Sequence, residues 1–442
     1  MPIKVGMVSL GCSKNLVDSE RMLYKLRKKG YELVTEPGLA DIAVVNTCGF
    51  IQSAKEEAIE TILELGKLKD DGTLKKIIIT GCLTERYKQE AAELFPEADA
   101  VIGIGNNKDI VDVLDHVLAN ERYINFAPKL DAELTGERII STLPFFAYLK
   151  IAEGCSNCCT YCAIPQIRGK YRSVPMEDVL SEARWLAENG VSEIIVIAQD
   201  TTRYGEDLYG ESKLPELLRE IAKIDGIRWI RVLYCYPERI TDELLDTIAN
   251  EEKIVKYLDI PIQHCNGDIL ESMNRWGDVA QLTALFEKIR AKVPGIILRT
   301  TLITGFPGET EEQFTELAEF VQKIRFDRLG CFAYSREDGT KAHDFPNQVE
   351  EEIAAHRADI IMEQQMLISA QNNEKLLGTR TCAVVEGFDR FGECYFGRTE
   401  ADAPDIDGKL FFSSEKPLNV GDYVNVEITD TLDYDLIGEV VE

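Results

Sequence analysis

The strongest constraint on the fold is a regular alternation of short apolar runs with helical patterns through the middle of the chain. Because parallel strands are joined by crossover helices, this order predicts six βα units in one parallel sheet, closed or partly closed into a barrel, over about residues 140–370. The strand candidates are Phe145–Ile151, Glu193–Ala198, Ile227–Tyr234, Val255–Ile260, Ile296–Ile303 and Arg328–Tyr334. The helical stretches between them are Met176–Asn189, Lys213–Ile224, Thr241–Asn250, Val279–Lys292 and Glu311–Lys323.

Two further domains flank this segment. Residues 1–125 repeat the β-then-α order, with strand candidates Ile3–Leu10, Ile42–Asn46 and Lys76–Thr80, and predict an N-terminal α/β parallel-sheet domain. Residues 376–442 carry short alternating runs such as Tyr423–Ile428, bounded by Gly and Asp, which predict a small all-β barrel. A chain of 442 residues exceeds one hydrophobic core, so this three-domain α/β organisation fits its length.

Charge and hydropathy restrict the partners. The chain has 49 basic and 77 acidic residues, a net charge of −28, and the last domain alone has five basic and fifteen acidic residues, or −10. Such a surface repels phosphate and favours a basic protein partner, although excess carboxylate also serves solubility alone. No run approaches the length of a membrane span and the first residues do not resemble a signal peptide, so we expect a cytoplasmic protein.

Four of the twelve cysteines fall within eight residues, at 155, 158, 159 and 162. Cys155, Cys159 and Cys162 give the spacing C-x3-C-x2-C, directly after the first strand of the central segment. Three thiolates on one loop can hold three irons of a four-iron cluster and leave the fourth iron open, which suits catalysis. The alternatives are structural cysteines or a zinc site, but four zinc ligands within eight contiguous residues make poor tetrahedral geometry.

Three more cysteines each follow a strand of the N-terminal domain. Cys12, Cys48 and Cys82 are 36 and 34 residues apart, close to one βα unit each. Because parallel strands share one carboxyl edge, three loops there can bring three thiolates together. Each cysteine adjoins a glycine (Gly11, Gly49 and Gly81), which permits close backbone approach. The pattern favours a second cluster over three buried cysteines that act as small hydrophobic residues.

The loop spacing, with Tyr161 before the third cysteine, resembles the radical S-adenosylmethionine (SAM) superfamily. In that superfamily SAM chelates the open iron and is cleaved by one electron. The resemblance implies SAM contacts at the ends of later strands, in Ala198-Gln199-Asp200, in Asp259–His264 and in Leu302–Glu309. The residues implied to bind SAM are Tyr161, Gln199, Asp200, Gln263, Thr304 and Gly305. Cys158 falls outside the superfamily spacing, so Cys155, Cys159 and Cys162 are the implied catalytic ligands.

Across nearly its whole length the chain resembles the methylthiotransferase family of radical SAM enzymes. Leu10-Gly-Cys-Ser-Lys-Asn-Leu-Val-Asp-Ser-Glu20 and Gln199-Asp200-Thr-Thr-Arg-Tyr-Gly205 are similar to the RimO branch, and the last domain resembles the TRAM module. The resemblance implies a sulfur-inserting transferase that adds a methylthio group to the β-carbon of an aspartate of small-subunit ribosomal protein twelve. It also implies two [4Fe–4S] clusters, metal ligands Cys12, Cys48, Cys82, Cys155, Cys159 and Cys162, and a reductant such as flavodoxin.

Two alternatives remain at this point. The same chemistry on tRNA adenosine is the nearest, and the acidic last domain disfavours it because a tRNA-binding surface should offer Lys and Arg. A non-catalytic iron–sulfur carrier or a zinc-stabilised adaptor is the other, and open three-cysteine sites disfavour a carrier. We expect the last domain to dock the ribosomal protein through surface carboxylates in Asp402–Asp407 and Asp430–Asp435. His264 and His343 are expected to form hydrogen bonds rather than to bind metal.

Overall fold

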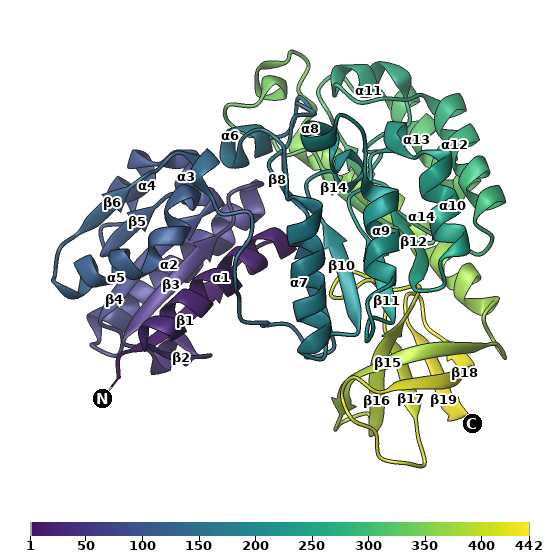
Figure 1. Cartoon of the computed structure of the whole chain (residues 1–442). Helices are drawn as coiled ribbons and strands as arrows, with labels where there is room; N and C mark the ends of the chain where they lie inside the picture. The colour runs from purple at the N-terminus through teal and green to yellow at the C-terminus, as the bar shows by residue number, and fades with distance from the viewer. Residues whose placement is uncertain (1, 442) are drawn as a thin grey trace. The chain divides into compact units, whose positions relative to one another are not determined.

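The computed structural model describes residues 2–441, which form two compact units (Figure 1). The first unit holds the chain up to Ser141 together with Ala152–Val174 and Ser335–His343. The second unit holds Thr142–Ile151, Pro175–Tyr334 and the chain from Asp344 onward. The cysteine loop at 155–162 therefore belongs to the same unit as Cys12, Cys48 and Cys82.

The first unit is built on a six-stranded parallel sheet in the order β2-β1-β3-β4-β5-β6. Its strands are β1 (Lys4–Ser9), β2 (Glu32–Val34), β3 (Ile42–Thr47), β4 (Lys76–Gly81), β5 (Ala100–Ile102) and β6 (Tyr123–Asn125). Its helices are α1 (Ser13–Lys29), α2 (Gln52–Asp70), α3 (Cys82–Tyr87), α4 (Gln89–Leu94) and α5 (Ile110–Leu118). The long strands match the predicted apolar runs, whereas β2, β5 and β6 are too short to produce a pattern of their own.

Alternation along β3 divides the core of this unit into two layers. Ile42 and Val44 pack on one face with α1 and α5, and Ala43 and Val45 pack on the other face with α2, α3 and α4. Both faces of the sheet are therefore covered, as the uninterrupted apolar strands require. With both faces buried, the carboxyl edge of the sheet is left for polar side chains.

Two later segments complete the first unit. Residues 152–174 contain the short ribbon β8 (Ala152–Glu153) with β9 (Arg172–Ser173), and the helix α6 (Ile164–Arg168). Residues 335–343 bring the buried Glu337, which pairs with Lys55 at 2.9 Å and with Arg86 at 2.7 Å. The backbone N–H of Ala342 also donates to the Thr160 carbonyl at 2.9 Å. These contacts tie the cysteine loop and residues 335–343 into the unit that carries the first three cysteines.

The second unit contains another six-stranded parallel sheet, in the order β14-β13-β12-β11-β10-β7. Its strands are β7 (Phe146–Lys150), β10 (Glu193–Ile197), β11 (Trp229–Val232), β12 (Ile254–Asp259), β13 (Ile297–Thr304) and β14 (Arg328–Ala333). The main helices between and after them are α7 (Met176–Glu188), α9 (Leu214–Ala222), α10 (Asp242–Asn250), α12 (Val279–Lys292), α13 (Glu311–Ile324) and α14 (Glu351–Glu374). All six predicted strands are present, and the sheet is open, which is the partial-barrel form of the prediction.

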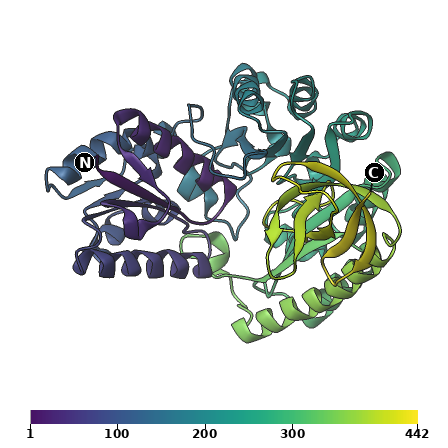
Figure 2. The ribbon, with the colours of Figure 1, turned by 90° about the horizontal axis from the view of Figure 1, so that it is seen from below.

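The second unit ends in a closed five-stranded barrel in the order β15-β16-β17-β19-β18. Its strands are β15 (Arg380–Asp389), β16 (Cys394–Thr399), β17 (Leu410–Ser413), β18 (Tyr423–Thr431) and β19 (Leu436–Val441). The end of α14 lies beside this barrel (Figure 2), where the Asn373 amide donates to the Leu432 carbonyl at 3.2 Å. The predicted fold class, an α/β N-terminal domain, a partial barrel and a small β barrel, is confirmed.

Buried ion pairs fix the small barrel to the edge of the central sheet. Glu193 of β10 is fully buried between Arg231, at 3.1 Å, and Arg398 of β16. Arg328 of β14 pairs with Asp402 at 2.6 Å. Because these charges are shielded from water, each side depends on its partner to remain buried.

Within residues 2–441, no helix is long and apolar enough to cross a membrane.

Candidate active site

The carboxyl edge of the first sheet gathers Cys12, Cys48 and Cys82. Cys12 precedes α1, Cys48 directly follows β3, and Cys82 is the first residue of α3 after β4. Strands β1 and β3 are neighbours, as are β3 and β4, so the three loops leave adjacent strands in the same direction. The structure therefore brings these three predicted residues together.

The three glycines beside these cysteines allow the loops to touch. A Cβ atom on Gly11 would lie 2.9 Å from the Cys48 sulfur, and one on Gly49 would lie 2.6 Å from the Leu83 Cα. At Gly81, with φ of +106°, it would lie 2.4 Å from the Thr47 carbonyl oxygen. Any side chain at these positions would push the cysteine loops apart. The glycines are part of the site because they set how closely the sulfurs approach.

Asn15 joins the loops by hydrogen bonds and was not identified from the sequence. Its side-chain N–H groups donate to the Leu10 carbonyl at 3.0 Å and to the Thr47 carbonyl at 2.9 Å. Its Oδ1 accepts from Arg168 at 2.5 Å and lies 3.7 Å from the Cys82 sulfur. This buried amide fixes the spacing of the first and second cysteine loops. Asn15 stands inside the motif that carried the family resemblance, but nothing in its spacing marked it as a site residue.

Burial and two nearby cations set the protonation of these thiols. Desolvation opposes the ionisation of Cys12, but the charges of Lys14 and Arg168, together with backbone N–H groups of Asn15 and Lys14, outweigh this effect and lower the pKa of Cys12. Burial dominates at the other two positions, where it raises the pKa of Cys48 and raises that of Cys82 to about 12. Metal binding at Cys48 and Cys82 would therefore release protons at neutral pH, because the thiolate is the ligand form.

The second set of cysteines lies on one loop. Cys155 and Cys159 are buried and Cys162 is half-buried, whereas Cys158 is exposed with φ of +55°. The Cys155 N–H donates to the Gly169 carbonyl at 3.0 Å, and the Cys162 N–H donates to the Cys159 carbonyl at 3.1 Å. These bonds close the loop on itself, with Cys158 on its outer side. The half-buried Tyr161 also lies in this loop.

Helix α6 follows this loop and contacts a cysteine of each set. The Ile164 N–H at its start lies 3.5 Å from the Cys162 sulfur. Ile167 packs with Cys82 and Ala163 in one buried cluster. Arg168, at the end of α6, lies 3.6 Å from the Cys82 sulfur through Nη2. The sequence did not predict a role for Arg168 either, because a single arginine after a cysteine loop forms no recognisable pattern.

The predicted SAM-contact residues of the second unit follow three strands of the central sheet. Gln199 and Asp200 come after β10, Gln263 comes after β12, and Thr304 ends β13. Asp200 is buried and accepts from the Thr202 hydroxyl at 2.6 Å. Gln263 has φ of +74° and pairs through its backbone with Thr301 and Ile303 of β13. These residues share the carboxyl edge of this sheet, where parallel α/β folds bind ligands.

The end of β13 also packs against α14. The Thr304 hydroxyl donates to the Ala354 carbonyl at 2.9 Å, and a Cβ on Gly305 would lie 2.1 Å from the Ala354 Cβ. The next turn holds the buried Glu309, which accepts from the Gly305 N–H at 3.0 Å and pairs with Arg357 at 2.8 Å. Gly305 therefore has a packing function that the sequence did not reveal.

The contacts of His264 and His343 agree with the prediction that both form hydrogen bonds. The Asn266 N–H donates to Nδ1 of the buried His264 at 2.9 Å. His343 of the first unit lies 3.2 Å from Asp338.

The donor chemistry of both cysteine sets fits iron–sulfur clusters. Cysteine thiolates are the usual ligands of such clusters, and each set offers three of them, two of which are buried. Within residues 2–441, no three Cys, His, Asp or Glu side chains are grouped so as to hold a single metal ion.

Three family models match the chain. Uncharacterized protein family UPF0004 covers residues 4–103, the radical SAM superfamily covers residues 149–321, and the TRAM domain covers residues 377–441.

Relatives match at full length. A protein of Acetivibrio thermocellus is 49% identical and covers 100% of this chain and 99% of its own length. Relatives from Clostridium acetobutylicum and Geobacter sulfurreducens are 48% and 49% identical, and each match covers 99% of this chain and 98% of the relative. All three have the name ribosomal protein uS12 methylthiotransferase RimO. The chain belongs to the RimO family.

Solved structures show the same architecture at low identity. The radical S-adenosylmethionine methyltransferase TsrM from Kitasatospora setae has a TM-score of 0.57 at 14% identity, over 86% of this chain and 79% of that one. The cobalamin-dependent radical enzyme OxsB has a TM-score of 0.53 at 14% identity, over 82% of this chain and 56% of that one. These similarities concern the fold. For this RimO-family chain, the match to the radical SAM superfamily implies SAM and one [4Fe–4S] cluster as cofactors.

Proposed function

We propose that this chain is a radical SAM methylthiotransferase that adds a methylthio group to the β-carbon of an aspartate of ribosomal protein uS12. The observation that carries the proposal is the presence of two three-cysteine sets in one unit, with α6 contacting a cysteine of each. Full-length relatives named for this activity on uS12 support it. A lone cysteine set would suit radical generation only, whereas two sets suit radical generation and sulfur delivery together.

The chain's own residues divide between two tasks. When bound, a [4Fe–4S] cluster with SAM supplies the radical chemistry that an unactivated C–H bond requires, and a second [4Fe–4S] cluster supplies the sulfur. Cys155, Cys159 and Cys162 hold the first cluster. Cys12, Cys48 and Cys82 hold the second, and Gly11, Gly49 and Gly81 keep their loops close. Burial of Cys48, Cys82, Cys155 and Cys159 limits the access of water to both.

The proposed SAM contacts are Tyr161 in the first unit and five residues of the second unit. Tyr161 follows Cys159 in the loop, and its ring supplies an apolar face. Gln199, Asp200, Gln263, Thr304 and Gly305 supply polar groups and backbone at the carboxyl edge of the second sheet. Asp200 is buried, and Thr202 and Arg239 hold its carboxylate in one orientation, in which we propose that it also accepts from the SAM amine.

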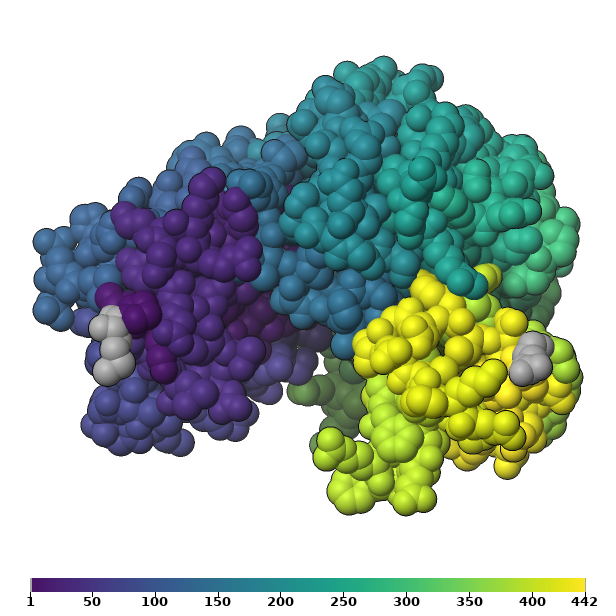
Figure 3. Space-filling model, turned by 60° about the horizontal axis from the view of Figure 1, so that its bottom comes forward, coloured from purple at the N-terminus to yellow at the C-terminus, as the bar shows by residue number. Residues whose placement is uncertain are grey.

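The acidic C-terminal barrel steers a basic substrate protein, with contacts that differ in part from those predicted. The prediction that Asp402 and Asp407 lie on the surface is wrong: Asp402 pairs with Arg328 at 2.6 Å, and the buried side chain of Asp407 accepts from the Tyr257 hydroxyl at 2.6 Å. Both hold the barrel on the central sheet. Asp405, Asp430 and Asp433 are exposed and remain available for docking. Figure 3 shows one face of this barrel, in yellow-green and yellow.

The test compares substrates directly. Purified chain is reconstituted anaerobically and supplied with SAM and a low-potential reductant such as flavodoxin, together with either uS12 or unmodified tRNA. Mass spectrometry is expected to find a methylthio mass increase on one aspartate of uS12 and no change in tRNA adenosine. Modification of tRNA with unmodified uS12 would contradict the substrate assignment. Modification of neither, with SAM cleavage intact, would contradict the transferase activity.

Charge reversal tests the docking surface. Asp430→Lys with Asp433→Lys should slow association with uS12, because exposed acidic groups act mainly on the encounter rate, and the wild-type rate should fall as salt is added. SAM cleavage without uS12 should not change. An unaltered association rate would place the docking surface elsewhere on the chain.

A further inference from the structure

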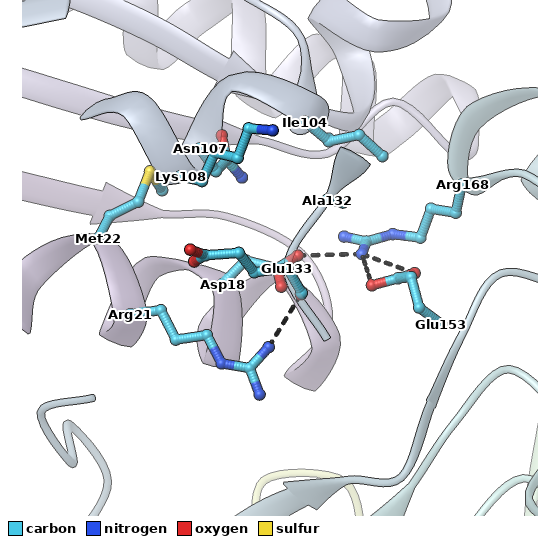
Figure 4. Close-up of a pocket in the computed structure, with 10 residues that line it drawn as sticks. All are labelled: Asp18, Arg21, Met22, Ile104, Asn107, Lys108, Ala132, Glu133, Glu153 and Arg168. Atoms are coloured by element: carbon cyan, nitrogen blue, oxygen red, sulfur yellow. Dashed lines mark hydrogen bonds and ion pairs between the residues drawn. The ribbon is translucent and has the colours of Figure 1, made fainter. Parts of the chain in front are cut away.

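Arg168 occupies an unusual place between charged groups and sulfur. It is the last residue of α6, six positions after Cys162, and its side chain is buried. Nη1 lies 3.0 Å from both the Asp18 and the Glu153 carboxylates. Nη2 lies 2.5 Å from the Asn15 Oδ1 and 3.6 Å from the Cys82 sulfur. Figure 4 shows the guanidinium turned towards Glu153 and Asp18.

The two carboxylates fix the guanidinium in this orientation. A planar guanidinium donates from two edges at once, and here one edge is held by Asp18 and Glu153. The remaining edge is thereby directed at Asn15 and Cys82. A guanidinium is not deprotonated in proteins, so the group stays charged. A lysine has a single ammonium group in place of the planar guanidinium, and it could not donate to the two carboxylates and to the Cys82 sulfur at the same time.

A fixed cation and an N–H donor beside a cysteine ligand have a defined effect on a cluster. Hydrogen bonds to ligand sulfur and nearby positive charge favour the reduced, more negative form and raise the reduction potential. Asp18 and Glu153 act in the opposite direction, and Arg168 compensates them. Loss of the guanidinium would therefore remove an N–H donor and leave the charges of Asp18 and Glu153 uncompensated. Both changes lower the reduction potential.

We propose that Arg168 is a positioning residue that raises the reduction potential of the cluster on Cys12, Cys48 and Cys82 and fixes the Cys82 sulfur against α6. The inference rests on the proposed function, because it requires a cluster at these three cysteines. It assigns Arg168 no contact with substrate. Arg168 instead affects the redox state of the cluster that donates sulfur. The radical chemistry takes place at the other cysteine set.

The experiment measures the potential of this cluster alone. The full-length chain carrying Cys155→Ala, Cys159→Ala and Cys162→Ala is reconstituted anaerobically, and its remaining cluster is titrated by electron paramagnetic resonance at set potentials. Adding Arg168→Met should lower the ratio of reduced to oxidised cluster at fixed potential about tenfold, which corresponds to about 59 mV for a one-electron couple. Arg168→Lys should shift it in the same direction by less, since charge is retained.

Two further variants separate this effect from a general loss of a buried charge. Arg138→Met removes another buried arginine of the first unit, which pairs with Glu20 at 2.5 Å, and should leave the potential unchanged even if the protein becomes less stable. Glu153→Gln removes a carboxylate and should shift the potential upwards. Thermal unfolding and iron content are recorded for every variant.

The outcomes are distinguishable. If the parent chain with the three loop cysteines replaced holds no iron, the second cluster is wrong and this inference falls with it. If the cluster is present and neither Arg168→Met nor Arg168→Lys shifts its potential, the role of Arg168 is overturned and the two-cluster assignment stands. If Arg168→Met loses its iron, the Arg168→Lys titration decides, and a potential equal to that of the parent overturns the proposal.

Discussion

The two cysteine sets reach the same ligand number by opposite routes. Cys155, Cys159 and Cys162 lie within eight residues, so chain connectivity alone keeps them close and little loop entropy is lost on bringing them together. Cys12, Cys48 and Cys82 are separated by 36 and 34 residues and meet only because β1, β3 and β4 are adjacent parallel strands. The local set depends on one turn, whereas the assembled set depends on the packing of three loops, so the two should fail under different substitutions.

The largest effect is expected from removing the local set. Cys155→Ala, Cys159→Ala and Cys162→Ala together should reduce the iron content from about eight to about four per chain and abolish both SAM cleavage and methylthio transfer. The reason is that the radical originates at this set. Iron and sulfide analysis with product chromatography provides the measurement, and retention of both clusters in this variant would refute the ligand assignment.

Removing the assembled set should separate the two activities. Cys12→Ala, Cys48→Ala and Cys82→Ala should also leave about four irons, keep reductive SAM cleavage and abolish methylthio transfer. The sulfur source is lost while the radical source remains. Mass spectrometry of uS12 alongside 5′-deoxyadenosine quantification reports both steps. Methylthiolated product at the wild-type rate would remove the sulfur-donor role from this set.

A single methyl group should distinguish the two sets. Gly81→Ala places a Cβ 2.4 Å from the Thr47 carbonyl oxygen at φ of +106°, which forces the second and third cysteine loops apart. We expect loss of the assembled-set cluster with the local-set cluster retained, so that iron content falls by about half. Stability should fall by more than the roughly 1 kcal/mol that a left-handed alanine costs.

The matched control for this substitution is Gly72→Ala. Gly72 has φ of +83° in the same unit, but its Cβ would meet nothing within 4 Å. Gly72→Ala therefore introduces the backbone strain of a positive φ but no steric clash. If both variants kept all their iron, close approach of the glycine loops would not be required at the assembled set.

The smallest effect is expected at the fourth loop cysteine. Cys158 is exposed at φ of +55°, on the outer side of the turn that buries Cys155 and Cys159. Cys158→Ala should keep both clusters and the rate of SAM cleavage within about twofold of wild type, since surface changes away from buried contacts shift stability by less than about 0.5 kcal/mol. Loss of one cluster in this variant would show that Cys158 is a ligand.

The acidic barrel shows where charge counting from the sequence failed. The net charge of −10 is a property of composition and stands, but the expectation that Asp402 and Asp407 belong to the solvent-facing surface did not hold. Their partners, Arg328 on β14 and Tyr257 on β12, lie far away in the sequence. Sequence spacing carries no information about which carboxylate meets which distant side chain, so the interface was not predictable.

The sequence by itself determined the order of βα units and the fold class, because hydrophobic periodicity is a local property of the chain, and its cysteine spacing predicts both ligand sets. Only the tertiary structure revealed the residues that connect these features: Asn15 between two cysteine loops, Arg168 beside Cys82, and Gly305 against α14. A polar or small residue acquires its role from the groups it meets. Here these contacts join residues of separate segments, which are close only after each sheet has formed and its faces have been covered.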